Sequence, residues 1–513
     1  MRKNLLPLTF FLTGALGAQT LLFDARGGSL PGTVSLSLKG GQPGFLGAVI
    51  LSATAGPTPL YLIDPTDPRI LDVGLEALAV SPYGSFNVSG QVSFPPLPVP
   101  NNPAFVDAAI FMQGVMLPGL TNTVGPISLP RPVRFAPAGA FRDRRTQFST
   151  PRAFFPVLPM ADHRWMIAGG GSGGLLSQVA QKTTEVYDPL TDAFSAGPTM
   201  NFDHSLHTAT KLANGRWLLA CGVDRLNDPQ TSCEVYDPQA NTFTAVAPTT
   251  DPRMGHTATL LANGKVLVTG GMSDLNAPNS PLDPIYSTLK TTEIYDPAAN
   301  TWAKGPDLTI PRVGHAAMVL PDGRILIAGG ISWYTFLGIK LPTVAKETEI
   351  FNPNVNPPTI TSGPSMGTAH SVFSTIEIAT GKFLVAGGIS GISLTNLGTP
   401  TAAAEIYTAN SGSGTWSSAG SMSKARGIHS AFDLGGGKFL HVGGADGQIF
   451  SPNALASTEV YDAVTPGWSA GPSLTMSRSG YGWFLTPMGQ IHILGGGSGA
   501  SAPTVNFTEW YYR

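Results

Sequence analysis

The sequence has little charge and almost no cysteine. Charged residues make up only 12% of its 513 residues, about half of the usual level of roughly 25%. The 30 basic and 32 acidic residues leave a net charge of −2, so no positive field exists to hold a polyanion, which argues against a nucleic-acid partner. With only two cysteines, the chain is not a disulfide-dense scaffold.

Long hydrophobic runs are also missing, apart from one at the N-terminus. The basic residues Arg2 and Lys3 precede an apolar stretch from Leu5 to Ala18 that ends in small residues. This pattern predicts a secretory signal peptide over residues 1–18. The stretch is shorter than the about 20 residues that cross a bilayer, so we expect no membrane span and a secreted or periplasmic protein.

Glycine and proline are abundant. The chain holds 61 Gly and 45 Pro, together about one residue in five, and 42% of its residues are hydrophobic. Disordered chains combine low hydrophobicity with high net charge, and this sequence has neither property. We therefore expect a large core built from short elements that are joined by many turns.

An internal repeat explains where many of the glycines lie. Seven short apolar runs each end in a Gly pair, or in Cys-Gly in the second unit. These runs are Trp165–Gly170, Trp217–Gly222, Val266–Gly271, Ile325–Gly330, Phe383–Gly388, Phe439–Gly444 and Ile491–Gly496. Four apolar residues are too few for a helix, so each run is predicted to be a buried strand.

Other residues recur in register with the Gly pairs. A Glu-x-aromatic step follows every pair, at Glu185, Glu234, Glu293, Glu349, Glu405, Glu459 and Glu509. An aromatic residue then opens a further strand in several units, as Trp302 does. A His or aromatic residue lies fifteen positions before the second Gly, at Phe155, His207, His256, His315, His429 and Tyr481. In the fifth unit we take His370, eighteen positions before the Gly, as the equivalent residue after a three-residue insertion.

Four predicted strands per unit, with these residues in phase, resemble the kelch repeat. The resemblance implies an all-β fold, with residues 133–513 forming a seven-bladed kelch β-propeller. The seventh unit ends in its third strand. The segment Val133–Phe141 is similar to Trp302–Pro306, so we expect residues near 133–150 to supply the missing fourth strand and to close blade seven.

Residues 19–132 lack the repeat. They contain alternating or apolar runs such as Thr33–Leu38 and Phe86–Phe94, separated by Gly and Pro turns. Short strands with this pattern predict a small β-sandwich-like domain. No motif in it indicates a function.

Cysteine and histidine offer two candidate features. Cys221 and Cys233 lie at the end of the second strand and the start of the third strand of one blade, where a disulfide fits an exported protein. A redox or metal-ligand pair is the alternative. The histidines at 207, 256, 315, 370 and 429 occur once per blade. The blades spread them around a ring, so we predict a structural role and no metal site.

A row of arginines is the main candidate binding feature. Three positions before the His or aromatic residue lie Arg152, Arg253, Arg312, Arg426 and Arg478, with His204 and Gly367 in the remaining units. The longest loops between the second and third strands, in units three and four, emerge on the same face and carry Tyr286, Trp333, Tyr334 and Phe336. Arginines hold carboxylates through forked hydrogen bonds, and the resemblance implies that such residues grip acidic peptides. Alternatively, they pair with the repeated Glu as framework.

We interpret the chain as a secreted, monomeric kelch-repeat protein without catalytic residues or cofactor. One propeller face is expected to bind a protein, an acidic peptide or a carbohydrate. The alternative is a secreted carbohydrate-active enzyme or a galactose oxidase-like oxidase, because those oxidases use a seven-bladed kelch propeller. They require a Cys cross-linked to a Tyr, a second Tyr and a pair of His ligands, and no Tyr-His pair occurs in this sequence.

Overall fold

The computed structural model divides the chain into two compact units, Met1–Ala136 and Pro137–Arg513. It describes residues 21–512 apart from 28, 31, 61–66, 68, 75–78, 82, 100–101, 103–104, 118–123, 174–178, 449–450, 487–488 and 500–503. The predicted signal peptide over 1–18 lies outside the described residues. The boundary falls after 136 rather than after 132, because β12 (Arg131–Arg134) pairs with β11 (Ala109–Leu117) of the first unit.

The first unit contains two antiparallel sheets. One comprises β1 (Leu22–Gly27), β3 (Gly32–Lys39), β10 (Leu97–Val99) and β9 (Gln91–Ser93); the other comprises β12, β11, β4 (Leu46–Ser52), β7 (Ala79–Val80) and β8 (Gly84–Ser85). A smaller sheet pairs β5 (Ala55–Pro59) with β6 (Ile70–Val73), and β2 (Ser29–Leu30) pairs with β13 (Ala136–Pro137). Alternate residues of β3 are buried, as expected for a strand with one face in a core.

The second unit is built from four-stranded antiparallel sheets, and its described residues form seven of them. The first three are β15 (Val157–Pro159), β16 (Trp165–Ala168), β19 (Thr184–Asp188) and β20 (Ala193–Ala196); β21 (Thr208–Lys211), β22 (Trp217–Ala220), β23 (Cys233–Asp237) and β24 (Thr242–Val246); and β25 (Thr257–Leu260), β26 (Val266–Thr269), β27 (Thr292–Asp296) and β28 (Thr301–Lys304).

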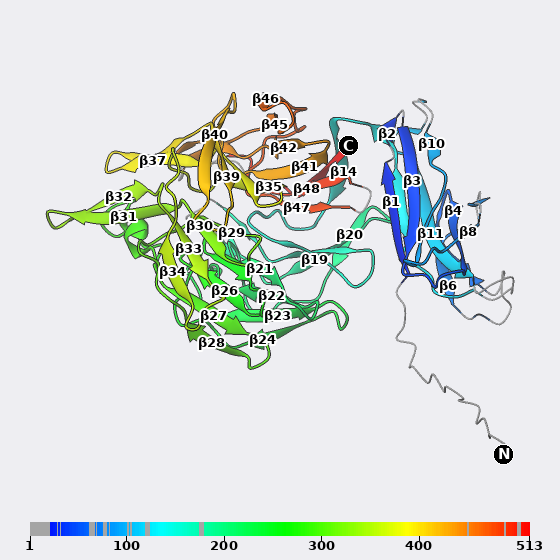
Figure 1. The fold of residues 1–513 in the computed structure, drawn as a ribbon, viewed down its shortest axis with the longest axis horizontal. Helices are drawn as coiled ribbons and strands as arrows, with labels where there is room; N and C mark the ends of the chain where they lie inside the picture. The colour runs from blue at the N-terminus through cyan, green and yellow to red at the C-terminus, as the bar shows by residue number, and fades with distance from the viewer. Residues whose placement is uncertain are drawn as a thin grey trace, which may run out of the picture. The chain divides into compact units, whose positions relative to one another are not determined.

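The next three sheets repeat this order. They are β29 (Ala316–Val319), β30 (Ile325–Ala328), β33 (Thr348–Asn352) and β34 (Thr359–Ser362); β35 (Ser374–Ala379), β36 (Lys382–Ala386), β39 (Ala403–Thr408) and β40 (Thr415–Ser421); and β41 (Ser430–Gly435), β42 (Lys438–Val442), β45 (Thr458–Asp462) and β46 (Gly467–Ala470). The described residues contain no α-helix, and none of their helical segments is long and apolar enough to cross a membrane. The fold is all-β (Figure 1).

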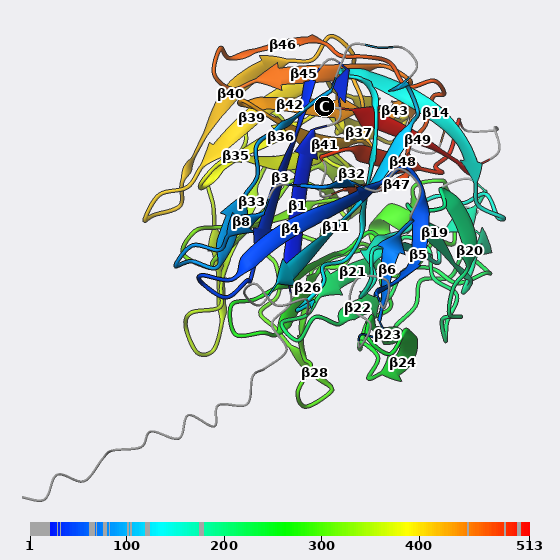
Figure 2. The same cartoon turned by 90° about the vertical axis from the view of Figure 1, so that its right-hand side faces the viewer.

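The seventh sheet combines strands from both ends of the unit. It comprises β14 (Ala140–Gln147), β49 (Phe507–Tyr512), β48 (Ile491–Leu494) and β47 (Gly482–Leu485), and Figure 2 shows β14 alongside β49. Phe141 lies opposite Tyr511, with ring centroids 5.1 Å apart, against 5.0 Å for Tyr295 and Trp302. Phe141, at the end of the segment compared with Trp302–Pro306, is therefore the equivalent of Trp302.

Hydrogen bonds from the Gly pairs join neighbouring sheets. The second Gly of each pair donates its N–H to a carbonyl of the next sheet, as from Gly222 to Arg253 at 2.9 Å and, across the chain ends, from Gly496 to Arg152 at 3.0 Å. Such a bond occurs at all seven junctions. At Gly222 a Cβ would lie 2.3 Å from the Ser205 carbonyl oxygen, and φ is +91°, so the close approach requires glycine.

Additional hairpins project between the second and third strands of several sheets. They are β17 (Gly171–Ser172) with β18 (Val179–Ala180), β31 (Ile331–Phe336) with β32 (Ile339–Val344), β37 (Ile389–Ser393) with β38 (Asn396–Pro400), and β43 (Ala445–Gln448) with β44 (Ser451–Ala454). The 3-10 helix η3 (Asp283–Ser287) occupies the same place in the third sheet. It packs on β31 and β32, β32 contacts β37, and β38 contacts β43.

Candidate functional site: the loop face of the propeller

The five candidate arginines are buried, and each forms an ion pair within its own sheet. Arg312 has no exposed surface. Its Nε and Nη2 donate to Glu349 Oε1 at 3.1 and 2.9 Å, and its Nη1 donates to the carbonyls of Gly329 and Glu347 at 2.7 and 2.8 Å. Equivalent pairs join Arg152 to Glu185, Arg253 to Glu293, Arg426 to Glu459 and Arg478 to Glu509, at 2.6 to 3.0 Å.

The glutamates connect these pairs to the backbone. Glu185, for example, accepts hydrogen bonds from the N–H groups of Ser149 and Thr150, at 2.6 and 3.3 Å. Burial lowers the pKa of Arg312, while the charge of Glu349 opposes that shift. Because the guanidinium groups are buried and already hydrogen-bonded, they cannot grip an acidic ligand at the mouth. The expectation of an arginine binding site at 152, 253, 312, 426 and 478 is corrected accordingly, and the contacts fit the framework alternative.

Two histidines occupy the arginine place in the remaining sheets. Nδ1 of His204 lies 2.7 Å from the carbonyl oxygen of Cys221, and Nδ1 of His370 lies 2.7 Å from that of Gly387. These are the carbonyls that Arg Nη1 contacts elsewhere. His370 is thus the equivalent of the arginines and not of His256, and Phe373 takes the place of His256. Unit five has no insertion, and Gly367 is not its arginine-equivalent residue.

Three of the remaining repeated histidines, His256, His315 and His429, hydrogen-bond to the preceding sheet. Nε2 of His315 lies 3.0 Å from Thr257 Oγ1 and 2.9 Å from Thr269 Oγ1 of the preceding sheet. Burial lowers the pKa of His315 to about 3, and burial also lowers the pKa values of His207, His256 and His429 well below normal. Within the described ranges, no three His, Cys, Asp or Glu residues are grouped so that they could hold a metal ion.

Because the pKa values of these buried histidines are lowered, we expect the protein to lose stability in mild acid. In the unfolded chain a histidine takes up a proton near pH 6.5, whereas folded His315 does so only near pH 3. The free energy of unfolding should therefore fall as the pH drops below about 6.5, by up to about 1.4 kcal/mol per pH unit for each such histidine. The variant His315→Phe carries the residue that stands at 155 and 373. Its free energy of unfolding, measured by urea titration between pH 7 and 5, should fall less steeply with decreasing pH than that of the wild type. Equal pH dependences would contradict the conclusion that folded His315 resists protonation.

Cys221 and Cys233 lie close together as buried free thiols. Sγ of Cys221 is 3.3 Å from Thr249 Oγ1. The hydrogen bond between the two thiols, together with burial, raises the pKa of Cys233 well above its usual value. Burial raises the pKa of Cys221, but hydrogen bonds from Cys233 and Thr249 outweigh this effect, so the net shift is downward. The disulfide stays a prediction.

The axis of the propeller is lined by one residue from each sheet. All seven residues have positive φ between 48° and 63°, and six backbone hydrogen bonds link them in the order Gly255, Gly314, Val372, Ile428, Gly480, Phe154 and Leu206. They line a cavity of 350 Å³ together with apolar side chains such as Met272, Leu275 and Ile285. No Lys or Arg lines this cavity, so it accommodates an apolar group rather than an anion.

Beside this cavity, the β31–β32 hairpin carries the predicted aromatic residues. Trp333 and Tyr286 are half-buried against one another, with ring centroids 6.3 Å apart. Lys340 Nζ lies 4.6 Å from the Trp333 ring centroid, and Tyr286 donates a hydrogen bond from its hydroxyl to the Lys340 carbonyl at 3.2 Å. These contacts fix the base of the hairpin on η3, so Tyr286 and Trp333 have mainly a bracing role.

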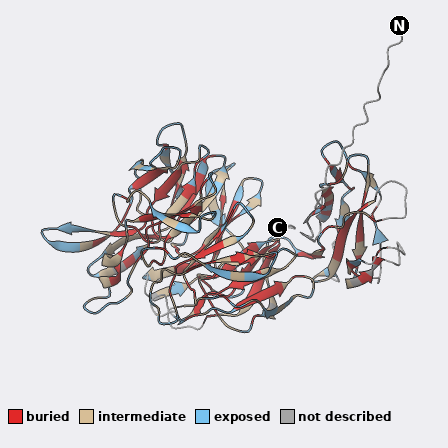
Figure 3. Cartoon of the chain, turned by 90° about the horizontal axis from the view of Figure 1, so that it is seen from below, coloured by how far each residue is buried: buried red, intermediate tan, exposed pale blue. Residues whose placement is uncertain are grey.

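The tip of the hairpin is apolar and exposed. Tyr334, Phe336, Leu337 and Ile339 have 51%, 59%, 85% and 59% of their surface exposed. In Figure 3 the hairpin that projects at the left is pale blue over most of its length. Tyr334 and Phe336 were expected on this face. Leu337 and Ile339 were missed, although the run Phe336-Leu-Gly-Ile339 in a predicted loop could have indicated them.

Comparison with known proteins agrees with the repeat. A family model described as the Kelch motif matches residues 253–309, which include Arg253, the Gly270–Gly271 pair, Glu293 and Trp302. The other sheets repeat that arrangement in the structure. The chain is a kelch-repeat β-propeller protein.

Two solved structures are similar to this kelch propeller. One is a fungal alcohol oxidase of the AA5 family in complex with copper, with 18% identity and a TM-score of 0.55 over 73% of this chain and 76% of the oxidase. The other is YjhT, with 13% identity and a TM-score of 0.42 over 71% of this chain and 95% of YjhT. The oxidase shows the shared fold alone. No functionally curated protein matches the sequence.

The predicted site residues of the kelch propeller thus separate into two groups. Tyr286, Trp333, Tyr334 and Phe336 come together on one hairpin and its support. The arginines lie deeper, inside the sheets. The sequence placed both groups near one face, but a repeated arginine looks the same in sequence whether it is buried or exposed.

Proposed function

We propose that this kelch propeller is an exported, non-enzymatic binding protein that captures a protein partner on its loop face. The loop face is defined here by the axial cavity and the tip of the β31–β32 hairpin. The exported location rests on the N-terminal sequence alone. The apolar tip formed by Tyr334, Phe336, Leu337 and Ile339 carries the proposal.

Contiguous exposed apolar side chains characterise protein interaction sites. Four such residues lie at one hairpin turn, and Phe336 is paired with Ile339 across it. The base of the hairpin is held by Tyr286, Trp333 and Lys340. A braced hairpin loses little conformational freedom on binding, which favours affinity.

The axial cavity favours a protein over the other predicted ligands. Its lining is almost entirely apolar, and sugar hydroxyls placed there would lose hydrogen bonds to water without replacing them. An acidic peptide would find no cation in the cavity, because the arginines pair with glutamates. An apolar side chain of a partner fits both the cavity and the neighbouring tip.

The tip is tested by charge substitution. A partner is first isolated from the medium of the native host by cross-linking to the full chain, and its affinity is then measured by calorimetry. We expect Leu337→Asp to weaken binding by at least about 30-fold, the effect of losing a hot spot, with an unchanged melting temperature. Val464→Asp, at an exposed apolar residue in the turn between β45 and β46, is the matched control and should bind normally. Equal affinities of the two variants would refute the proposal.

A further inference from the structure

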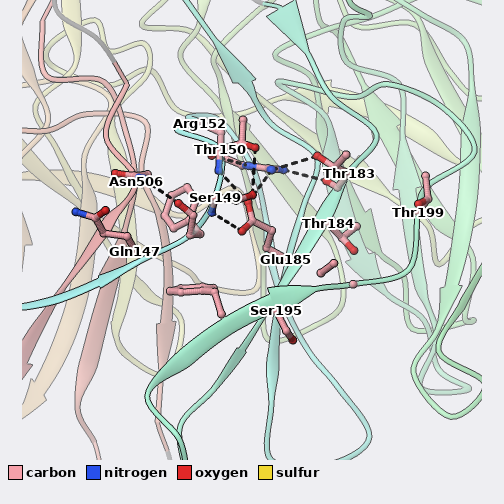
Figure 4. A pocket seen from close by; sticks show the side chains of 14 residues that line it. Gln147, Ser149, Thr150, Arg152, Thr183, Thr184, Glu185, Ser195, Thr199 and Asn506 are labelled. Carbon is pink, nitrogen blue, oxygen red and sulfur yellow. Dashed lines mark hydrogen bonds and ion pairs between the residues drawn. The ribbon is translucent and has the colours of Figure 1, made fainter.

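A second hollow lies where the ring is closed, between the closing strand and the first sheet. Its volume is 620 Å³, within the usual range of about 300–1000 Å³ for small-molecule sites. Gln147 of β14, the segment after it, and Asn506, which precedes β49, form one side. Residues of β19 and β20 form the other (Figure 4). We call it the closure groove.

The closure groove lies at the junction whose outer strand is the closing strand, and this strand differs from its equivalents. At three junctions the indole N–H of a Trp donates to a carbonyl of the preceding sheet, as from Trp302 to Ala247 at 2.8 Å. The accepting carbonyl lies in the fourth strand of that sheet or just after it. Phe194 stands at that place in the first sheet and cannot donate, and neither can Phe243 and Ile360 at that place in the second and fourth sheets. The closing strand also lacks the Gly-Pro turn that follows β20, β28, β34 and β46. Thr184 and Thr292 donate to the proline carbonyl of such turns, whereas the equivalent Thr508 hydroxyl has no partner in the described structure.

The lining of the closure groove is polar but uncharged at its rim. Gln147, Ser149 and Thr199 are exposed, and Asn506 Nδ2 donates to the Phe148 carbonyl at 2.8 Å, which leaves its amide oxygen available. Phe194 supplies apolar surface, and the buried Phe148 packs against it with ring centroids 5.5 Å apart. Hydroxyl and amide groups beside aromatic carbon match the mixed polar and C–H surface of a sugar.

The only charges of the closure groove cancel each other. All five guanidinium N–H donors of Arg152 are used: Nε bonds the Thr150 carbonyl, Nη1 bonds those of Gly169 and Thr183, and Nη2 bonds Thr183 Oγ1 and Glu185 Oε1. Glu185 accepts two backbone N–H groups in addition. An anionic ligand would therefore find no free cationic donor, and a cationic ligand no free carboxylate.

We propose that the closure groove binds a neutral saccharide, whose hydroxyls exchange hydrogen bonds with the side chains of Gln147, Thr199 and Asn506. This site is separate from the loop-face tip and needs no residue of it. A chain that binds a protein at the tip and a glycan at the closure groove can link the two.

The test uses the full chain. It is applied to a printed array of neutral, sialylated and sulfated oligosaccharides, and the best neutral glycan is then titrated by calorimetry. We expect neutral glycans to bind and Thr199→Trp, which fills the closure groove, to weaken their binding by at least about tenfold. Ser473→Trp is the matched control, because Ser473 precedes Arg478 by the same five residues that separate Thr199 from His204. It should bind as the wild type does, and so should Leu337→Asp.

Three results would overturn the proposal. They are the absence of neutral glycan binding in saturation-transfer NMR at millimolar sugar, a preference for sulfated or sialylated glycans, and unchanged affinity in Thr199→Trp. If Leu337→Asp loses protein binding but keeps glycan binding, the proposal for the closure groove is unaffected. The tests of the loop-face tip and of the closure groove are therefore independent.

Discussion

The variant Arg312→Met is expected to lose about 3–5 kcal/mol of unfolding free energy. Arg312 is fully buried, and it donates to Glu349 and to two carbonyls. Methionine fills much of the same volume but leaves the Glu349 carboxylate buried without its counter-charge, which is the costly way to break a buried ion pair. Equilibrium denaturation in guanidinium chloride, followed by tryptophan fluorescence, measures the loss.

Two controls separate this effect from general damage. Arg216→Met removes an arginine that pairs with Asp237 while half of its side chain is exposed, and such surface pairs contribute about 1 kcal/mol or less. The double variant Arg312→Met/Glu349→Leu removes both charges and should recover part of the lost stability. A loss below about 1 kcal/mol in Arg312→Met, with partner binding abolished, would return the arginines to the role of binding site.

The repeat made the propeller predictable from the sequence. Gly271 and Glu293 recur in phase in all seven units because each sheet has to meet its neighbour in the same way. Gly271 donates to the next sheet with φ of +100°, and Glu293 anchors the segment that leads into its own sheet. Constraints that recur at every junction leave the same residue at every junction, so periodicity alone identifies them.

The sequence does not show which of the repeated or loop side chains are buried. Arg253 and Trp333 both lie near the loop face, but Arg253 is enclosed by its own sheet and Trp333 packs on η3. Aligning the units by residue type also gave a wrong equivalence where a different residue type occupies an equivalent position. His370 contacts the Gly387 carbonyl as arginine does elsewhere, and its equivalence appears only when position eighteen before the second Gly is compared in all units.

The two proposed sites depend on departures from the repeat. The apolar tip is an insertion in the fourth unit, and the closure groove lies where the closing strand differs from its equivalents. A single departure in a sequence does not show whether neighbouring side chains fill the space it leaves. The three-dimensional arrangement of Phe148, Asn506 and Thr199 is needed to show that a hollow remains.

Removing the closing strand should destabilise the propeller more than any single substitution. The comparison is between residues 137–513, which keep β14, and residues 148–513, which lack it. In the shorter chain, β49 loses its partner and Tyr511 loses its contact with Phe141. We expect a loss larger than the about 3–5 kcal/mol that removal of one buried aromatic side chain costs.

The exposed edge of β49 should also change the association state. An unpaired strand edge pairs readily with other chains, so residues 148–513 should elute as oligomers in size-exclusion chromatography and melt broadly at lower temperature. Residues 137–513 should remain monomeric with a cooperative transition in calorimetry, because they form a compact unit of their own and the ring stays closed. Matching melting curves and elution volumes for the two chains would mean that β14 does not hold the ring closed.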